Sequence, residues 1–200
     1  TTVAAAYTID NSCMFNSADS SNLTRTPGSE GNRRTFTISV WLKFAIVSTT
    51  SGGIISCGDE ADGSTGHGDC VIHAKPYPYS GSYANALGIR FLDASNNSTI
   101  QTVAKYVDPT AWYHFVFRWD TTQAIATDRY AIYTNNVYQS FSVVNQAPLN
   151  YQTNFNSTEP QGIGFLGPGG GASAYFNGYM ADVIMIDGQS LTPDSFGEYN

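Results

Sequence analysis

Hydrophobic residues occupy every second position in several stretches of this chain, the pattern of a β-strand with one buried face. The clearest stretch is residues 35–44. Its apolar face carries Phe36, Ile38, Val40, Leu42 and Phe44. Its other face carries Thr35, Thr37, Ser39, Trp41 and Lys43. Successive side chains of a strand point to opposite faces of a sheet, so we predict an antiparallel strand with one face on a core and the other toward solvent.

Residues 112–120 alternate in the same way, with fewer polar positions. One face carries Tyr113, Phe115, Phe117 and Trp119, and the other carries Trp112, His114, Val116 and Arg118. Because both faces are rich in apolar or aromatic residues, we predict a central strand that is covered on both sides. The residues expected in or near the core are Phe36, Ile38, Val40, Leu42, Phe115, Phe117, Ile132 and Val183.

Further short strands are predicted at residues 53–57, 70–74, 87–92, 99–105, 129–134, 137–143, 162–166 and 174–176. Asn135 and Asn136 separate two of them and tolerate positive φ, which predicts a tight hairpin turn. One short helix is expected near the end of the chain, with Thr192 as its N-cap and Pro193 in its first turn. Many short strands with turns between them are typical of an all-β sandwich or barrel. No linker divides residues 1–200, so we expect a single domain.

Charge and cysteine content narrow the classes of function. The chain has 9 basic and 16 acidic residues and a net charge of −7, so it lacks the clustered cations that a nucleic-acid partner requires. No apolar run approaches the roughly 20 residues of a membrane-spanning helix, so membrane insertion is not expected. The three cysteines are too few for a disulfide scaffold. Cys57 and Cys70 could form a disulfide across a hairpin or remain partly buried thiols, and Cys13 is expected in the core.

Three stretches, in this order, resemble one group of domains. Residues 175–196 (YFNGYMADVIMIDGQSLTPDSF) are similar to the closing strand of laminin-G-like and pentraxin-like domains. Residues 112–116 (WYHFV) and 130–136 (YAIYTNN) resemble a pair of strands in the middle of laminin-G domains. Residues 23–37 (LTRTPGSEGNRRTFT) and the string DGQSLTP at 187–193 look most like lectin-like domains of tailed-bacteriophage structural proteins.

This resemblance covers the chain from about Asn22 to its end. It implies a concanavalin A-like jelly roll, in which two antiparallel sheets form a sandwich. It also implies a structural role for His114, as a hydrogen-bonding residue in the core or between the sheets. The same fold serves lectins, adhesion modules, glycanases and purely structural proteins, so function has to be argued from a site.

Glycoside hydrolysis is the first chemistry to test, because laminarinase-type enzymes share this fold. Those enzymes need paired carboxylates on one strand, at the spacing E-x-D-x-x-E. The nearest match starts at Glu60, lacks the third acid and lies in a glycine-rich loop. We therefore expect that the protein is not an enzyme. A β-glucan-type glycoside hydrolase with an unrecognised acid pair remains the third alternative.

Calcium is the one cofactor for which the sequence offers ligands. Asp59 and Asp62 lie in a loop that resembles the place where pentraxin-like domains carry their first calcium acids, and calcium prefers such oxygen ligands. The second acidic segment of that family has no counterpart here, because residues 167–172 contain no acid. The alternative is a solvated acidic turn without metal. Cys57, His67, Cys70 and His73 do not have a familiar zinc spacing, so zinc is not expected.

A loop with three tyrosines is the main candidate for contact with a partner. Tyr77, Tyr79 and Tyr83 lie among alternating prolines, which disfavour a central strand and hold the chain semi-extended. Tyrosine offers a flat face and a hydroxyl at low entropic cost, which suits a protein surface or a sugar ring. The alternative is that the three rings pack back on their own domain.

The favoured interpretation is a non-enzymatic protein on the surface of a bacteriophage virion, as capsid decoration or as a tail or fibre module. It would serve attachment or particle stabilisation, as a homo-oligomer or in a multi-copy assembly beside other virion proteins, with weak affinity for a host-surface glycan. The alternative is a secreted, extracellular calcium-dependent lectin or adhesion domain.

Overall fold

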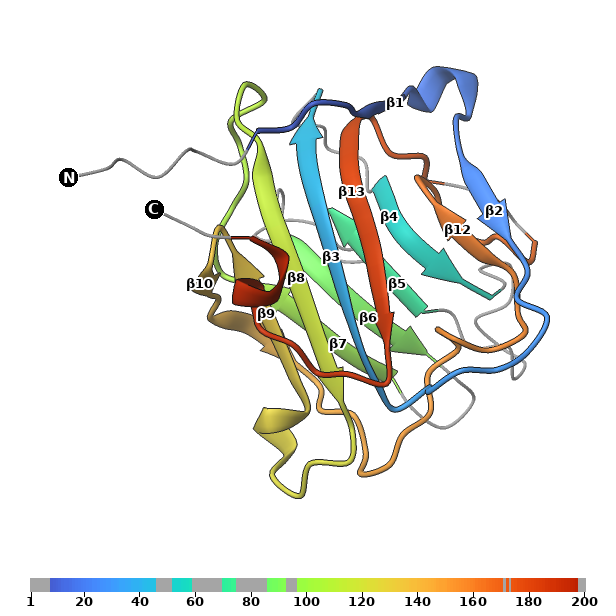
Figure 1. The fold of residues 1–200 in the computed structure, drawn as a ribbon, viewed down its shortest axis with the longest axis vertical. Coiled ribbons are helices and arrows are strands. Elements are labelled where there is room, and N and C mark those ends of the chain that lie inside the picture. Colours follow the sequence, from blue (N-terminus) through green and yellow to red (C-terminus); the bar gives the residue numbers. More distant parts are fainter. Residues whose placement is uncertain are drawn as a thin grey trace.

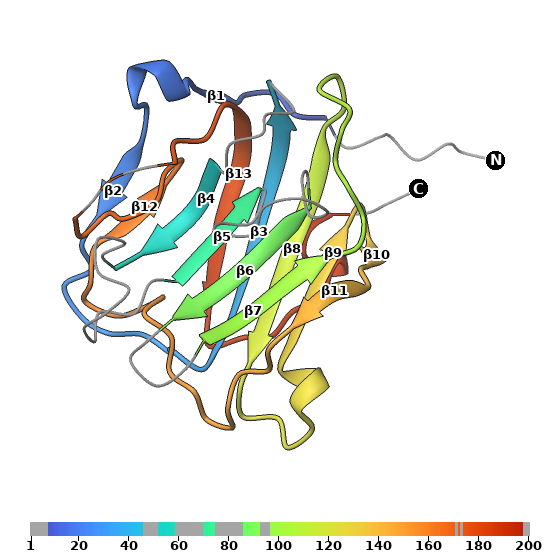
Figure 2. The same cartoon turned by 180° about the vertical axis from the view of Figure 1, so that it is seen from behind.

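Two antiparallel sheets lie face to face in the computed structural model (Figures 1 and 2), which describes residues 8–45, 52–58, 70–74, 86–92, 97–170, 172 and 174–197. The first sheet has the order β1 (Cys13–Phe15), β13 (Gly178–Asp187), β3 (Thr35–Phe44), β8 (Tyr113–Asp120), β9 (Tyr130–Thr134) and β10 (Val137–Tyr138). The second has the order β11 (Phe141–Val144), β7 (Asn97–Thr102), β6 (Leu87–Leu92), β5 (Cys70–Ala74), β4 (Gly52–Cys57), β12 (Gln161–Ile163) and β2 (Leu23–Arg25). This arrangement confirms the predicted two-sheet sandwich.

The core lies between the sheets, where the predicted apolar faces meet. Phe36, Ile38, Val40, Leu42, Phe115, Phe117 and Ile132 are all at most 2% exposed, and Val183 is half-buried against them. The second sheet contributes Ile54, Ile72, Leu87, Ile89, Phe91 and Ile100. Across the interface, the rings of Phe91 and Trp119 have centroids 4.0 Å apart. The alternation therefore predicted correctly which faces of β3 and β8 point inward.

The outer face of β3 does not face solvent as expected, because the segment after β13 covers it. This segment crosses the front of β3 and β8 in Figure 1 and ends in a 3-10 helix, η3 (Pro193–Phe196). Thr37 is fully buried; its Oγ1 donates to the Gln189 carbonyl at 2.7 Å and accepts from the Leu191 N–H at 2.8 Å. Ser39, the next outward residue, is also buried. The polar face of β3 thus serves as a docking site for the chain's own C-terminal segment.

Several local expectations need correction. The predicted terminal helix is only the single turn η3, and the Thr192 side chain makes no capping hydrogen bond. Cys13 is exposed, because β1 is a three-residue edge strand in which Phe15 is the buried residue. The strand predicted at residues 137–143 is divided between β10 and β11, which belong to different sheets. Residues 174–176 form no strand, although Tyr175 makes an isolated bridge with Gly53.

The hairpin between β9 and β10 is confirmed. Asn135 and Asn136 have φ angles of 47° and 67°, so both adopt the left-handed conformation that a two-residue turn requires. Two further 3-10 turns, η1 (Ser17–Asp19) and η2 (Ala126–Arg129), connect strands. No helix within the described residues is long and apolar enough to cross a membrane.

Candidate functional site

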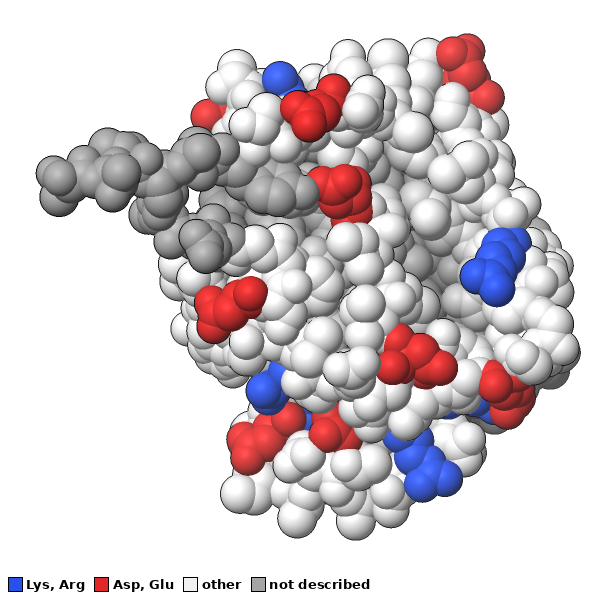
Figure 3. Space-filling view, viewed as in Figure 1, with Lys and Arg blue, Asp and Glu red and all other residues white. Residues whose placement is uncertain are grey.

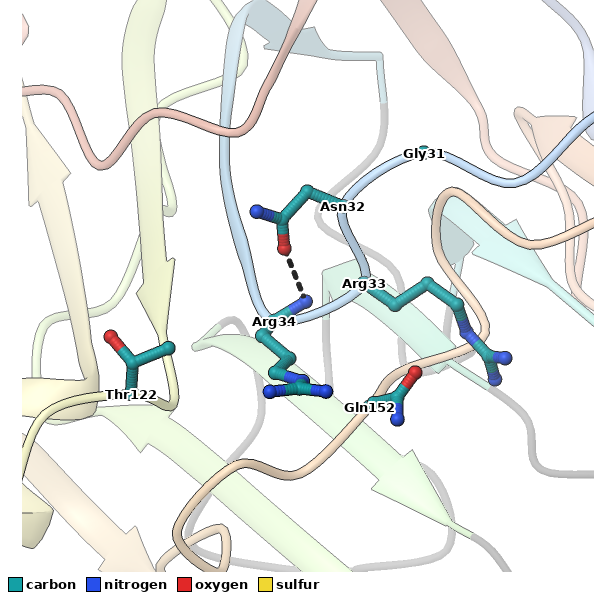
Figure 4. Close-up of a pocket in the computed structure, with 6 residues that line it drawn as sticks. All are labelled: Gly31, Asn32, Arg33, Arg34, Thr122 and Gln152. Atoms are coloured by element: carbon teal, nitrogen blue, oxygen red, sulfur yellow. Dashed lines mark hydrogen bonds between the residues drawn. The ribbon is translucent and has the colours of Figure 1, made fainter.

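A pocket of about 310 Å³ opens at the end of the sandwich where β3 begins and β8 ends. This is the lower end of the molecule in Figure 1. Three segments meet there: the loop before β3, the turn after β8 and residues 150–154. The lining residues are Gly31, Asn32, Arg33, Arg34, Thr122 and Gln152 (Figure 4). More than 100 residues separate the first of these from the last, so only the tertiary fold assembles the pocket.

Hydrogen bonds of both the side chain and the backbone of Asn32 hold the loop before β3 in place. Asn32 Oδ1 accepts from the backbone N–H groups of Arg34 and Thr35, both at 2.9 Å. Asp187 Oδ1, at the end of β13, accepts from the Asn32 N–H at 2.8 Å and from Asn156 Nδ2 at 3.0 Å. The loop is therefore fixed to the ends of two strands, which makes it a rigid wall of the pocket.

Gly31 is required by the close approach of Asp187 to this loop. A methyl group on residue 31 would lie 2.6 Å from Asp187 Oδ2, so Gly31→Ala would push the carboxylate away from its donors. We expect Gly31→Ala to lower the free energy of unfolding by about 1–2 kcal/mol. Gly28→Ala is the matched control, because a methyl there has no neighbouring atom within 4 Å. Urea unfolding of both variants checks this, and equal losses would contradict it.

The Arg33 side chain holds the wall of the pocket together, because its hydrogen bonds go to neighbouring segments of the protein. Its Nε donates to the Thr153 carbonyl at 2.6 Å, its Nη1 lies 3.2 Å from Glu30 Oε1, and its Nη2 donates to Asn154 Oδ1 at 3.2 Å. The Thr153 N–H in turn donates to the Arg33 carbonyl at 3.0 Å. Because Tyr151 and Thr153 are both buried, Gln152 between them is left exposed at the pocket.

The third wall is the turn after β8, which Asp120 organises. Asp120 Oδ1 accepts from Thr122 Oγ1 at 2.6 Å, and its Oδ2 accepts from Gln123 Nε2 at 2.6 Å. Burial acts to raise the pKa of Asp120, but hydrogen bonds from Thr122, Gln123 and Thr35 outweigh it, so the pKa lies below its usual value. Asp120 is therefore an ionised structural acceptor.

Three polar side chains in the pocket keep unused hydrogen-bonding groups. Within the described part of the chain, no hydrogen bond or ion pair engages the Arg34 guanidinium, the Gln152 amide or the Asn32 side-chain N–H₂. Figure 4 shows Arg34 and Gln152 pointing toward the same space, whereas Arg33 turns away from it. Figure 3 shows that acidic side chains are spread over the face of the six-stranded sheet and that basic ones do not gather there. The pocket is thus a local group of hydrogen-bond donors on an acidic protein.

None of the site residues predicted from the sequence is among the six described residues that line this pocket. Asp59 and Asp62, and Tyr77, Tyr79 and Tyr83, lie outside the described residues, so the calcium site and the aromatic contact loop stay predictions. Among the described residues, no three His, Cys, Asp or Glu side chains are grouped as a metal site.

The cysteine pair can be followed only in part. Strand register places Cys57, which is buried, directly opposite Cys70 on the neighbouring strand. Directly opposed residues of antiparallel strands have Cα atoms about 4.5–5.5 Å apart, within the range that a disulfide spans. The Cys70 side chain lies outside the described atoms. The disulfide therefore stays a prediction.

His114 is structural, as the resemblance implied, but it does not lie between the sheets. Alternation along β8 places it on the outer face, where it is 1% exposed and Ser39 Oγ is 2.8 Å from its Nε2. Trp41 stacks on the imidazole with centroids 4.7 Å apart, and Phe196 of η3 contacts its edge. Burial lowers the pKa of His114 to about 4, against a smaller opposing effect of Asp182. His114 is a neutral residue that packs beneath the C-terminal segment.

No residue of the pocket was singled out as functional from the sequence. Residues 23–37, which resemble part of the lectin-like phage domains, include the pocket-lining residues 31–34. The only local signal was the pair Arg33 and Arg34 in a chain with few cations. Nothing local links that pair to Thr122 or Gln152.

Solved structures with this fold include a pentraxin, a sialidase CBM40 and a pair of laminin domains. The native heptameric SAP-like pentraxin from Limulus polyphemus matches with a TM-score of 0.54 and 19% identity, over 86% of this chain and 72% of the pentraxin. The CBM40 of the Ruminococcus gnavus IT-sialidase, bound to α2,3-sialyllactose, matches with a TM-score of 0.54 and 13% identity, over 86% of this chain and 95% of that one. Domains LG4-5 of the mouse laminin α1 chain match with a TM-score of 0.55 and 10% identity, over 87% of this chain and 41% of that one.

Identities this low show a shared fold and nothing finer. A search of curated protein sequences finds no significant match. A family model described as the concanavalin A-like lectin/glucanases superfamily matches residues 17–195. This match spans most of the chain and agrees with the two-sheet sandwich. The protein therefore belongs to the concanavalin A-like lectin/glucanases superfamily, as a laminin-G-like domain.

Proposed function

We propose that this domain is a non-enzymatic carbohydrate-binding or adhesion module, with its sugar site in the pocket at the end of the sandwich. The observation that carries the proposal is the pair of polar side chains Arg34 and Gln152, which line one pocket and keep unused donors on a rigid frame. Sugars are recognised by such convergent polar groups, because each hydroxyl can donate and accept a hydrogen bond.

The size and composition of the pocket support a small, weakly held sugar. Its volume of about 310 Å³ is at the lower end of the roughly 300–1,000 Å³ typical of small-ligand sites. None of the six lining residues is aromatic, so hydrogen bonds would supply most of the affinity. Weak single sites become effective when several copies bind one surface together. We therefore propose that the domain works in a multi-copy assembly.

Catalysis is not part of the proposal, because glycoside hydrolysis needs a protonated acid and a second carboxylate that flank the sugar. None of the six lining residues is Asp or Glu. Asp120, in the turn behind Thr122, is occupied by three side-chain donors and has a lowered pKa, which suits neither an acid nor a free nucleophile. Release of reducing sugar from β-glucans would contradict this part of the proposal.

Location on a bacteriophage virion is the second part of the proposal. It rests on the resemblance of residues 23–37 and 187–193 to phage structural proteins. Mass spectrometry of purified particles would test it, and we expect peptides of this chain in particles that have been stripped of loosely bound protein. A protein found only in soluble secretions would favour the calcium-dependent lectin instead.

The test of sugar binding is an array of immobilised glycans probed with the labelled protein. We expect retention on a subset of glycans, in millimolar calcium and in chelator alike, because the six lining residues of the pocket include no carboxylate ligand for a metal. Retention that disappears in chelator would favour a calcium site at Asp59 and Asp62 over the pocket. If no glycan retains the protein in either condition, the proposed function is wrong.

A further inference from the structure

We infer that the pocket selects an anionic sugar, and that Arg34 binds the carboxylate or sulfate group of that sugar. The inference rests on the proposed function and adds the chemical class of the ligand. It starts from an imbalance of charge inside the pocket. Two of the six described residues that line it are arginines, and none of the six is Asp or Glu.

The two arginines differ in what they can still bind. Arg33 lies 3.2 Å from Glu30 and also donates to a backbone carbonyl and to Asn154, so its charge is paired and each of its three nitrogens already has a partner. Arg34 has none of these partners within the described residues, and its side chain is exposed. A guanidinium offers five N–H donors in a planar fork, which pairs with both oxygens of a carboxylate.

No acid forms an ion pair with Arg34 in the described part of the chain, and the two carboxylates that hold the frame of the pocket accept hydrogen bonds from other groups. Asp120 accepts from the side chains of Thr35, Thr122 and Gln123. Asp187 accepts from the Asn32 N–H and the Asn156 amide. The only ion pair between described residues joins Arg33 to Glu30. The guanidinium donors of Arg34 are therefore available to a ligand.

The backbone of Arg34 is fixed, which allows its side chain to bind with defined geometry. Its N–H donates to Asn32 Oδ1 at 2.9 Å, and its carbonyl accepts from the Thr121 N–H at 2.9 Å. Thr121 is itself fully buried and donates through Oγ1 to the Tyr151 carbonyl at 2.7 Å. Gln152, within residues 150–154, lines the same pocket as Arg34. Gln152 can bind a hydroxyl of the same sugar ring while Arg34 binds the acid.

The test compares matched pairs of soluble sugars by titration calorimetry with the intact protein. One pair is methyl glucuronoside and methyl glucoside, which differ in a carboxylate. The second pair is galactose 6-sulfate and galactose, which differ in a sulfate. We expect at least one acidic sugar to bind about tenfold tighter than its neutral partner, equivalent to about 1.4 kcal/mol. A preference in the first pair assigns a carboxylate, and one in the second assigns a sulfate.

Arg34→Gln should abolish that preference, and Arg25→Gln is the matched control. Arg25 is an exposed arginine on β2, away from the pocket, so the control makes the same change in net charge. Because the Arg34 side chain bonds no other described residue, both variants should unfold at the same urea concentration as the parent protein. A preference that both substitutions reduce equally would reflect overall charge and overturn the inference.

Two further results separate this inference from the proposed function. Equal binding of acidic and neutral sugars, unchanged by Arg34→Gln, would overturn the inference and leave sugar binding intact. Absence of binding to these four sugars, together with retention on neutral glycans of the array, would also overturn the inference. Absence of binding to any glycan would overturn the proposed function itself.

Discussion

Replacing Phe117 with alanine should lower the free energy of unfolding by about 3–5 kcal/mol, the usual cost of truncating a fully buried phenylalanine. Phe117 is 1% exposed and lies in the middle of β8, between Ile38 of β3 and Ile132 of β9 in the strand register. The cost combines lost burial with the cavity that the ring leaves behind. A loss of this size is a large part of the roughly 5–15 kcal/mol that stabilises a typical domain.

Urea unfolding measures the effect, and Tyr138→Ala provides an aromatic control. Tyr138 lies on the edge strand β10 and is 54% exposed, so its truncation should cost less than about 1 kcal/mol. A loss below about 1 kcal/mol for Phe117→Ala would mean that β8 presents its other face to the core.

Lowering the pH from about 6.5 to about 4 should reduce the free energy of unfolding by about 3 kcal/mol through His114 alone. The pKa of His114 is lowered to about 4 in the folded protein, against about 6.5 in an unfolded chain. Between those two values the unfolded state binds a proton and the folded state does not, so the free energy of unfolding decreases as the pH decreases. The contribution is fully present above about pH 6.5 and is lost as the pH falls to about 4.

Unfolding of the parent protein and of His114→Gln at pH 7.5 and at pH 4.5 isolates this contribution. All other ionisable groups are the same in the two proteins, so their contributions cancel in the comparison. The variant should be less stable at pH 7.5, because it loses the contacts of the imidazole with Ser39 and Trp41. It should also depend less on pH than the parent protein does. Parallel pH dependence of the two proteins would show that His114 titrates normally and is not buried as described.

Strand patterns predicted most of the fold because each strand buries one face, and alternation along the chain records that face. The alternation at residues 35–44 and 112–120 identified the central strands β3 and β8 and their buried residues. The burial of Thr37 and Ser39 could not be predicted in the same way. It depends on Gln189 and Leu191, more than 150 residues away in the chain, whose backbone groups make hydrogen bonds with Thr37.

The candidate site was less predictable than the fold for a related reason. Its frame depends on single contacts between distant residues, such as the Asn32 N–H with Asp187 and the Arg33 side chain with residues 153 and 154. No periodic pattern records such contacts. The sequence instead predicted sites in two other loops. One is a calcium site at Asp59 and Asp62, and the other is a contact loop with the tyrosines at 77, 79 and 83. Those hypotheses remain open to experiment.

The central claim is that this superfamily member binds a sugar at the end of the sandwich beside Arg34. It is tested most directly by NMR chemical-shift mapping of the isotope-labelled protein during titration with the tightest-binding glycan. We predict that the largest shifts are in the backbone amides of Gly31, Asn32, Arg34 and Thr122 and in the Gln152 side-chain amide. Saturating shifts confined to other parts of the chain, with these signals unmoved, would contradict the account.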